Sequence, residues 1–215
     1  MIQIETWFPI HMGHVVNPFH KEIEDELTQQ CLKIKKSYKK EFEEYRDFSS
    51  SYSQGPALDW FRFQDASSYS LLEDQKFNRI NNWIDDQVNE YAEQLAFYKK
   101  LKCVEGWFNI YEKYDYAGYH VHPPNVVSCV YFLNCEEETA GKLIFKNNND
   151  AQGVFSSRAK SPITSVVSHN PTPGKLVIFS SDLEHCAQQH LTDDLRITLA
   201  YNHTTENDVE KRVKK

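Results

Sequence analysis

The sequence lacks the features that would direct it to a membrane or through a secretory pathway. No apolar run approaches the roughly 20 residues that a helix needs to cross a bilayer. The first ten residues contain neither the basic start nor the long apolar stretch of a secretory signal. The five cysteines are odd in number and form no CxxC pair, which favours free thiols in a reducing compartment. We therefore expect a cytoplasmic protein that makes no membrane contact.

The sequence also lacks an excess of positive charge. It has 24 Lys and Arg against 31 Asp and Glu, which gives a formal net charge of −7. Nucleic-acid phosphates are bound by clustered Lys and Arg, so we expect no nucleic-acid partner. No internal repeat is visible, and a length of 215 residues suits one domain. Hydrophobic residues make up 40% of the chain, which is enough for a substantial core.

Two stretches in the first half of the chain have the composition and periodicity of helices. Residues 20–45 are rich in Glu, Lys and Leu, and apolar residues recur at every third or fourth position. Residues 70–100 carry a longer apolar stripe, and Ser70 with Glu73 has the spacing of a capping box. The Ser-, Gly- and Pro-containing stretch between them is typical of a loop. We expect both helices to pack against one face of a sheet.

Beyond residue 101 the pattern changes to short, β-branched and aromatic segments separated by Gly, Pro and Asn. Seven or eight short strands of this kind predict a closed or double-layered antiparallel sheet, as in a barrel or jelly roll. The polar stretch 146–174 is too long for a hairpin, so it is either a substrate loop or a passive insertion. The strands are expected near residues 104–116, 126–133, 142–145, 163–168, 175–179, 186–190 and 195–201.

The most informative motif is the pair His120 and His122, which are separated by one residue and followed by the apolar run 126–133. Side chains two positions apart in an extended strand point to the same face, so both imidazoles can reach one ion. Neutral imidazole is a common ligand of iron, zinc, copper and nickel. The same pattern also occurs as two hydrogen-bonded histidines without a metal.

Two further signals lie downstream of the histidine pair. His185 follows a turn and an apolar strand, and Arg196 and Thr198 lie two positions apart on the last predicted strand. In a double-stranded β-helix, early and late strands face each other, so histidines distant in sequence can converge on one ion. Arg196 could then point into the same cavity, where its guanidinium would bind a carboxylate better than Lys would. Alternatively, it forms a surface ion pair with Asp193 or Asp194.

Together these segments resemble a family of iron(II)/2-oxoglutarate oxygenases found in bacteria and phages. The similarity covers about residues 105–203 and rests on three blocks, HxHPxN…SxVYFL, PGxLVIFxSxxxH and RITxxYN. It implies a mainly β, α+β fold, a double-stranded β-helix with two long helices packed against one sheet. It also implies one oxygenase domain over residues 1–203, with helical support at about 17–101 and a β-helix core at about 103–203. The charged residues 204–215 are expected to form a frayed tail.

The resemblance also implies roles for individual residues. His120 and His185 would be iron ligands, and Arg196 with Thr198 would bind the distal carboxylate of 2-oxoglutarate. Tyr131 is a second candidate for that carboxylate. The implied cofactors are Fe(II), 2-oxoglutarate and O2, and the implied reaction hydroxylates a C–H bond of a small molecule or a protein side chain.

One position departs from the common pattern of that superfamily, which has Asp or Glu where His122 stands. Either His122 completes a three-histidine site, or a water or a nearby carboxylate (Asp182 or Glu184) occupies that position. We favour His122 as the third ligand. A neutral ligand leaves the iron more positive, which should weaken iron binding by the protein and favour the anionic cosubstrate.

Two other functional classes fit parts of the pattern. A three-histidine cupin-type dioxygenase or isomerase would use the metal without 2-oxoglutarate, and a non-enzymatic β-domain would bind no iron. The aromatic residues near the predicted site could line a pocket or belong to the core, and two asparagines could reach the cavity. The aromatic residues are Trp107, Tyr114, Tyr116 and Tyr119, and the asparagines are Asn109 and Asn125. The sequence does not specify the oligomeric state, for which a homodimer is one option.

Overall fold

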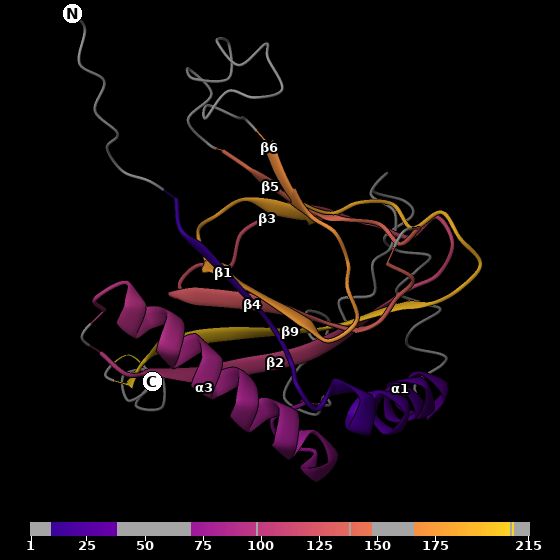
Figure 1. The fold of residues 1–215 in the computed structure, drawn as a ribbon, viewed down its shortest axis with the longest axis horizontal. Coiled ribbons are helices and arrows are strands. Elements are labelled where there is room, and N and C mark those ends of the chain that lie inside the picture. The colour runs from indigo at the N-terminus through magenta and orange to yellow at the C-terminus, as the bar shows by residue number, and fades with distance from the viewer. Residues whose placement is uncertain are drawn as a thin grey trace, which may run out of the picture.

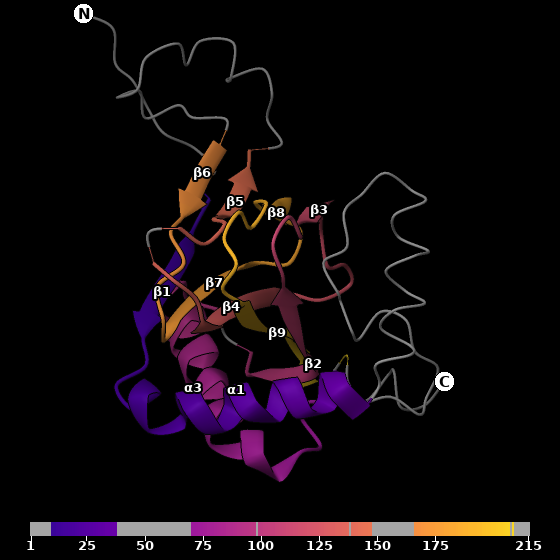
Figure 2. The same ribbon diagram turned by 90° about the vertical axis from the view of Figure 1, so that its right-hand side faces the viewer.

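The computed structural model describes residues 10–37, 70–97, 99–137, 139–147, 166–206 and 208. Two sheets face each other, and two helices cover the outer face of the larger sheet (Figures 1 and 2). The larger sheet contains, in spatial order, β1 (Met12–Val16), β7 (Lys175–Ser180), β4 (Val127–Asn134), β9 (Arg196–Thr205) and β2 (Leu101–Tyr111). The smaller sheet contains β3 (Ala117–His120), β8 (His185–Ala187), β5 (Leu143–Lys146) and β6 (Val166–His169).

All strand pairings among the described residues are antiparallel. The two facing sheets and the helices on one of them form a double-stranded β-helix, so the predicted fold class is confirmed. Neighbouring strands in the larger sheet are far apart in sequence. For example, β4 lies between β7 and β9. This topology places the last strand inside the sheet, between β4 and β2, where its side chains contact the helices on one face and the smaller sheet on the other.

Side chains on β9 point alternately towards the helices and towards the smaller sheet, as the period of an extended strand requires. Ile197, Leu199 and Tyr201 belong to the core between the larger sheet and the helices. Arg196 and Thr198 point the other way and line the pocket between the sheets. The same strand therefore supplies both a hydrophobic core and a polar site.

The helices dock through apolar stripes of helical period. In α3 (Asn78–Gln94), the fully buried Ile80, Ile84 and Val88 lie four residues apart on one face. Tyr201 on β9 donates a hydrogen bond of 2.9 Å to the Oδ1 atom of Asn81, which ties this helix to the central strands. The predicted packing of both helices on one sheet is confirmed.

The first helix, α1 (His20–Ser37), is held at its start by the turn that precedes β7. Gly174 in this turn has a φ of +80°, and a Cβ atom there would lie 2.8 Å from a ring atom of His20. Glycine is required because the backbone conformation and the approach of the helix both exclude a side chain. The backbone N–H of Asn17 donates to the carbonyl of Gly174 at 2.8 Å, which fixes the entry into the helix.

Several predicted boundaries change in the structure. The second helix begins at Asn78, after a 3₁₀ turn (η2, Gln75–Phe77), because Asp74 accepts the capping hydrogen bond from the N–H of Lys76. The Ser70 hydroxyl accepts instead from Leu72, so the predicted capping box does not form. Strand β9 continues through the buried Thr205, so the predicted tail starts two residues too early. Residues 38–45 of the predicted first helix and residues 148–165 of the predicted loop lie outside the described residues.

Candidate functional site

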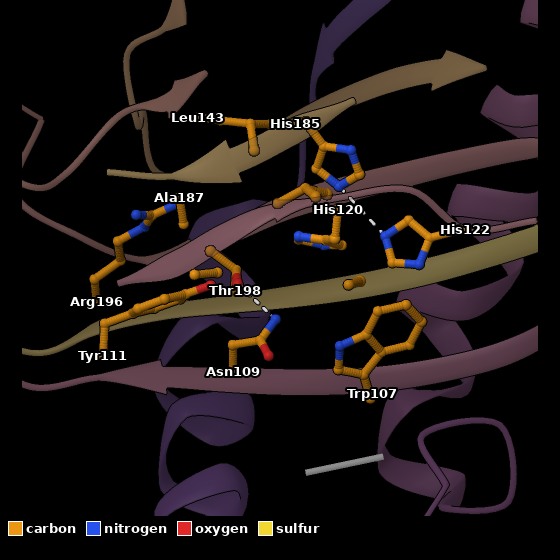
Figure 3. A pocket seen from close by; sticks show the side chains of 13 residues that line it. Trp107, Asn109, Tyr111, His120, His122, Leu143, His185, Ala187, Arg196 and Thr198 are labelled. Atoms are coloured by element: carbon orange, nitrogen blue, oxygen red, sulfur yellow. Dashed lines mark hydrogen bonds between the residues drawn. The ribbon is translucent and has the colours of Figure 1, made fainter. Parts of the chain in front are cut away.

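Three imidazoles converge in the pocket between the two sheets (Figure 3). His120 ends β3 and His185 begins β8, and the two residues are register partners across these strands. His122 follows two residues after His120, and one ligand atom from each of the three lies within 4.8 Å of the others. The Nε2 atoms of His122 and His185 are 3.3 Å apart, which suits two nitrogens that share an ion at about 2.1 Å.

Hydrogen bonds at one ring nitrogen fix the tautomers of His120 and His185. The Nδ1 atom of His120 lies 2.7 Å from the carbonyl oxygen of Gly118, and that of His185 lies 2.9 Å from the carbonyl oxygen of Leu183. A carbonyl oxygen only accepts, so each Nδ1 carries the proton and each Nε2 keeps its lone pair. Metal-binding histidines commonly make this second hydrogen bond. Both imidazoles are therefore in the tautomer that can bind a cation.

His122 is positioned by a turn and not by the strand ladder, which differs from the prediction. Strand β3 ends at His120, and Pro123 and Pro124 have no N–H with which to continue the ladder. The N–H of His122 donates to the carbonyl of Ser181 at 2.7 Å, and its own carbonyl accepts from the N–H of Asn125 at 3.0 Å. The residue is 8% exposed, and its imidazole still reaches the other two histidines.

A buried arginine lies at the opposite end of the same pocket (Figure 3). Arg196 is 1% exposed, and its guanidinium carbon lies 4.6 Å from the ring centroid of Tyr111 and 5.6 Å from that of Phe132. Its Nε and Nη1 atoms have no hydrogen-bond partner among the described residues. Burial lowers the pKa of Arg196, yet a guanidinium stays charged in proteins. An unpaired buried charge is costly, and an anionic ligand in the pocket would offset that cost.

The alternative of a surface ion pair for Arg196 is excluded by its neighbours. Asp193 pairs with Lys113 at 2.9 Å, and the carboxylate of Asp194 lies 3.8 Å from the Nε2 atom of His190. The aromatic rings on either side of the guanidinium keep it inside the pocket. The cation therefore faces the histidines across the cavity and not the solvent.

Polar and aromatic residues occupy the space between the arginine and the histidines. Asn109 donates a hydrogen bond of 3.4 Å to the Oγ1 atom of Thr198, and Figure 3 shows this pair between the two ends of the pocket. The ring of Trp107 lies 5.6 Å from that of His122. The cavity is open to solvent on one side. It is lined by Trp107, Asn109, Tyr111, Ala117, His120, His122, Val130, Leu143, His185, Ala187, Arg196, Thr198 and Ala200.

Tyr131 does not belong to this pocket, which corrects its predicted role at the carboxylate. Its hydroxyl accepts from the Nδ2 atom of Asn17 at 3.1 Å and lies 2.8 Å from the Nδ1 atom of His20, on the helix side of the larger sheet. Side chains alternate along β4, so Val130 faces the pocket and Tyr131 faces away from it.

Tyr111 is a pocket residue that the sequence reasoning missed. It follows Trp107 and Asn109 at spacings of two on β2, and all three line the cavity. This alternation was present in the sequence and could have identified it. Its register partner on β9 is Arg196, which explains the contact between the ring and the guanidinium.

A second group of potential metal ligands lies under α3, outside the pocket. It contains Asp85, Cys103 and His203. The Nε2 atom of His203 lies 2.7 Å from the carboxylate of Asp85, and the thiol of Cys103 donates to the carbonyl of Glu105 at 3.3 Å. Burial raises the pKa of the Cys103 thiol, which opposes the thiolate form that metals bind. Each of these three side chains thus has a hydrogen-bond or ion-pair partner within the chain.

The facing sheets and the three-histidine cluster opposite a buried arginine define a double-stranded β-helix protein with a candidate metal centre. Residues 105–202, which contain all of the polar side chains of the pocket, match the family model described as "Putative 2OG-Fe(II) oxygenase". This match confirms the predicted resemblance to the Fe(II)/2-oxoglutarate oxygenases, a family of oxidoreductases.

Solved structures share the fold across most of the chain. A prolyl-4-hydroxylase from Pseudomonas putida is 14% identical, with a TM-score of 0.53 and coverage of 91% of this chain and 93% of that one. The α-ketoglutarate-dependent epimerase SnoN of nogalamycin biosynthesis is 11% identical, with a TM-score of 0.57 and coverage of 91% and 77%. AviO1 from Streptomyces viridochromogenes Tue57 is 14% identical, with a TM-score of 0.55 and coverage of 92% and 90%. A comparison with curated proteins finds no match to this sequence.

None of the helices in the described ranges combines the length and the apolar character needed to cross a membrane.

Proposed function

We propose that this protein binds Fe(II) through His120, His122 and His185 and 2-oxoglutarate through Arg196, and that it uses O2 to hydroxylate a substrate C–H bond. The observation that carries the proposal is the buried, unpaired guanidinium of Arg196 in the same cavity as three convergent imidazoles. A dicarboxylate that chelates a metal at one end and meets a cation at the other satisfies both ends of this pocket.

The donor set fits Fe(II), although it lacks the usual carboxylate. Neutral imidazoles suit divalent iron, and the separation of 3.3 Å between the Nε2 atoms of His122 and His185 favours direct ligation by both rings. Asp182 and Glu184 have other partners, since Asp182 accepts from Ser180 and Glu184 pairs with Lys146. Three neutral ligands leave the full charge of the ion, which attracts an anionic cosubstrate.

The other end of the pocket fits the distal carboxylate of 2-oxoglutarate. Arg196 offers a planar fork of N–H donors that matches a carboxylate, and the Thr198 hydroxyl lies on the same face of β9. Tyr111 and Phe132 hold the guanidinium in place and exclude water around it. When bound, iron and 2-oxoglutarate supply the oxidising chemistry, in which O2 converts the cosubstrate to succinate and CO2 and one oxygen atom enters the substrate.

Two alternative functions explain less of the pocket. A cupin-type metal enzyme that does not use 2-oxoglutarate would give Arg196 no defined ligand. A non-enzymatic β-domain would give no ligand to either the histidines or the arginine.

We further propose a small-molecule or protein side-chain substrate, because the similar structures include a prolyl hydroxylase and an epimerase of nogalamycin biosynthesis. The five free cysteines support a cytoplasmic location. The absence of a nucleic-acid partner and the option of a homodimer stay predictions.

The proposal is tested by anaerobic reconstitution with Fe(II), followed by addition of 2-oxoglutarate and O2. We expect one iron per chain and slow succinate formation even without the substrate, and we expect neither in a His185→Ala variant. Iron binding without any 2-oxoglutarate turnover or binding would favour the cupin-type alternative. No bound iron would exclude both enzymes.

A further inference from the structure

The turn that carries His122 is anchored by a carboxylate outside the metal cluster. The Oε2 atom of Glu105 accepts from the Nδ2 atom of Asn125 at 3.3 Å, and the backbone N–H of Asn125 donates to the carbonyl of His122 at 3.0 Å. Because His122 lies beyond the end of β3, these bonds replace the support that a strand ladder would give.

A second chain of hydrogen bonds connects Glu105 to the other backbone group of His122. The same Oε2 atom accepts from the Nδ2 atom of Asn202 at 2.6 Å. The hydroxyl of Ser128 donates to the Oδ1 atom of Asn202 at 2.7 Å and lies 2.8 Å from the hydroxyl of Ser181. The carbonyl of Ser181 in turn accepts from the N–H of His122 at 2.7 Å.

Glu105 and Asn125 are partly buried, whereas the inner members of this network are buried and fix one another's orientation. Asn202 and Ser128 are each 2% exposed, and Ser181 is fully buried. Since Ser128 donates to Asn202, the Ser181 hydroxyl must donate to Ser128. The amide of Asn202 therefore has one orientation, with its NH2 group towards Glu105 and its oxygen towards Ser128. Such networks are rigid when every member is satisfied.

We propose that Glu105 is a positioning residue for His122, which it fixes through Asn125 on one side and through Asn202, Ser128 and Ser181 on the other. This inference rests on the proposed function, because it assumes that His122 binds the metal. Glu105 acts as a hydrogen-bond acceptor for two amides at one oxygen atom, so a neutral side chain with an oxygen in the same place can replace it. Its charge is not required.

The test measures Ni(II) affinity by calorimetry in the full-length protein. Ni(II) binds more tightly than Fe(II) to a given nitrogen site, so weakened variants stay measurable. We expect Glu105→Ala to weaken binding about 10- to 100-fold, the range found for residues that orient metal ligands. Glu105→Gln should bind within about threefold of the wild type, because its amide oxygen can accept both bonds. Asn125→Ala, which removes only the link to the turn, should weaken binding in the same direction.

A double-mutant cycle separates positioning of His122 from a general effect on the fold. In a His122→Ala background, Glu105→Ala should cause no further loss of affinity, because the residue that it positions is absent. An equal loss in both backgrounds, wild-type affinity in Glu105→Ala, or a Gln variant as weak as the Ala variant would each overturn the inference. A wild-type protein that binds no Ni(II) would instead refute the proposed function, and this inference with it.

Discussion

Arg196 combines nearly complete burial with a formal charge, which is costly for stability. Its side chain is one of the largest fully buried groups in the described chain, and two nitrogens of its charged guanidinium, Nε and Nη1, have no hydrogen-bond partner among the described residues. Aromatic contacts on two sides compensate only part of the desolvation cost. The buried guanidinium therefore lowers the stability of the ligand-free protein, and we expect a bound anion to offset this cost.

Replacing this charge should have opposite effects on stability and on binding. We expect Arg196→Met to raise the free energy of unfolding of the ligand-free protein by about 1 to 3 kcal/mol. The same variant should lose at least about 100-fold in 2-oxoglutarate affinity, because charge-assisted bonds are each worth about 1.5 to 3 kcal/mol. Thermal melts and calorimetry measure the two effects.

Arg196→Lys is the matched control, since it keeps the charge and loses the planar fork. It should bind 2-oxoglutarate with intermediate affinity and gain no stability. Unchanged 2-oxoglutarate binding in the Met variant would contradict the assignment of the carboxylate site.

At the scale of elements, the contact between α1 and β4 depends on a buried histidine. His20 on the helix lies 2.8 Å from the hydroxyl of Tyr131 on the strand and 3.4 Å from the carboxylate of Glu24. Burial lowers the pKa of His20 below its ordinary value of 6.5, and Glu24 opposes this shift only in part. The folded protein therefore prefers the neutral imidazole.

This preference predicts a pH dependence for the docking of α1. Because the unfolded chain binds the proton more readily, the contribution of His20 is present above pH 6.5 and is lost as the pH falls from 6.5 through the lowered pKa. His20→Gln should reduce the slope of unfolding free energy against pH in this window, as measured by urea titrations. The same substitution at the exposed His14 is the control, and an unchanged slope in His20→Gln would contradict the prediction.

At the scale of the whole molecule, the site joins the two sheets. His120 and His185 lie on the smaller sheet, whereas Arg196 and Thr198 lie on the larger one. A metal bound at the histidines and a dicarboxylate that reaches the arginine would connect the layers at both ends of the cavity. Ligand binding should therefore stabilise the global fold and not only local loops.

Adding first the metal and then a 2-oxoglutarate analogue tests whether bound ligands connect the two sheets. Mn(II) with the inert analogue N-oxalylglycine, at about 100 times its dissociation constant, should stabilise the folded state by about 2.7 kcal/mol. For a chain of this size that corresponds to a rise in Tm of roughly 5 to 10 °C. The analogue should give little stabilisation without the metal, and none with the metal in a His185→Ala variant. Full stabilisation in that variant would place the analogue elsewhere.

Much of this architecture could be predicted from local patterns. Two apolar stripes of helical period identified the helices, and short β-branched segments identified most strands. The errors have physical causes. The strand β1 was missed because its sequence, Met-Gly-His-Val-Val, is short, and it is defined by pairing with β7. The second helix starts late because a 3₁₀ turn capped by the side chain of Asp74 precedes it, and Ser70 forms no capping box.

The sequence by itself determined the chemical types in the site, since the HxH pair, His185, Arg196 and Thr198 could be identified from motif spacing and family resemblance. Only the tertiary structure decided which face of each strand lines the pocket. It places Tyr111 in the pocket and Tyr131 outside it. It also decided that a turn anchored by Glu105 carries His122. The reason is that local patterns fix the period of a strand, whereas pairing and packing across the whole chain fix which side faces the cavity.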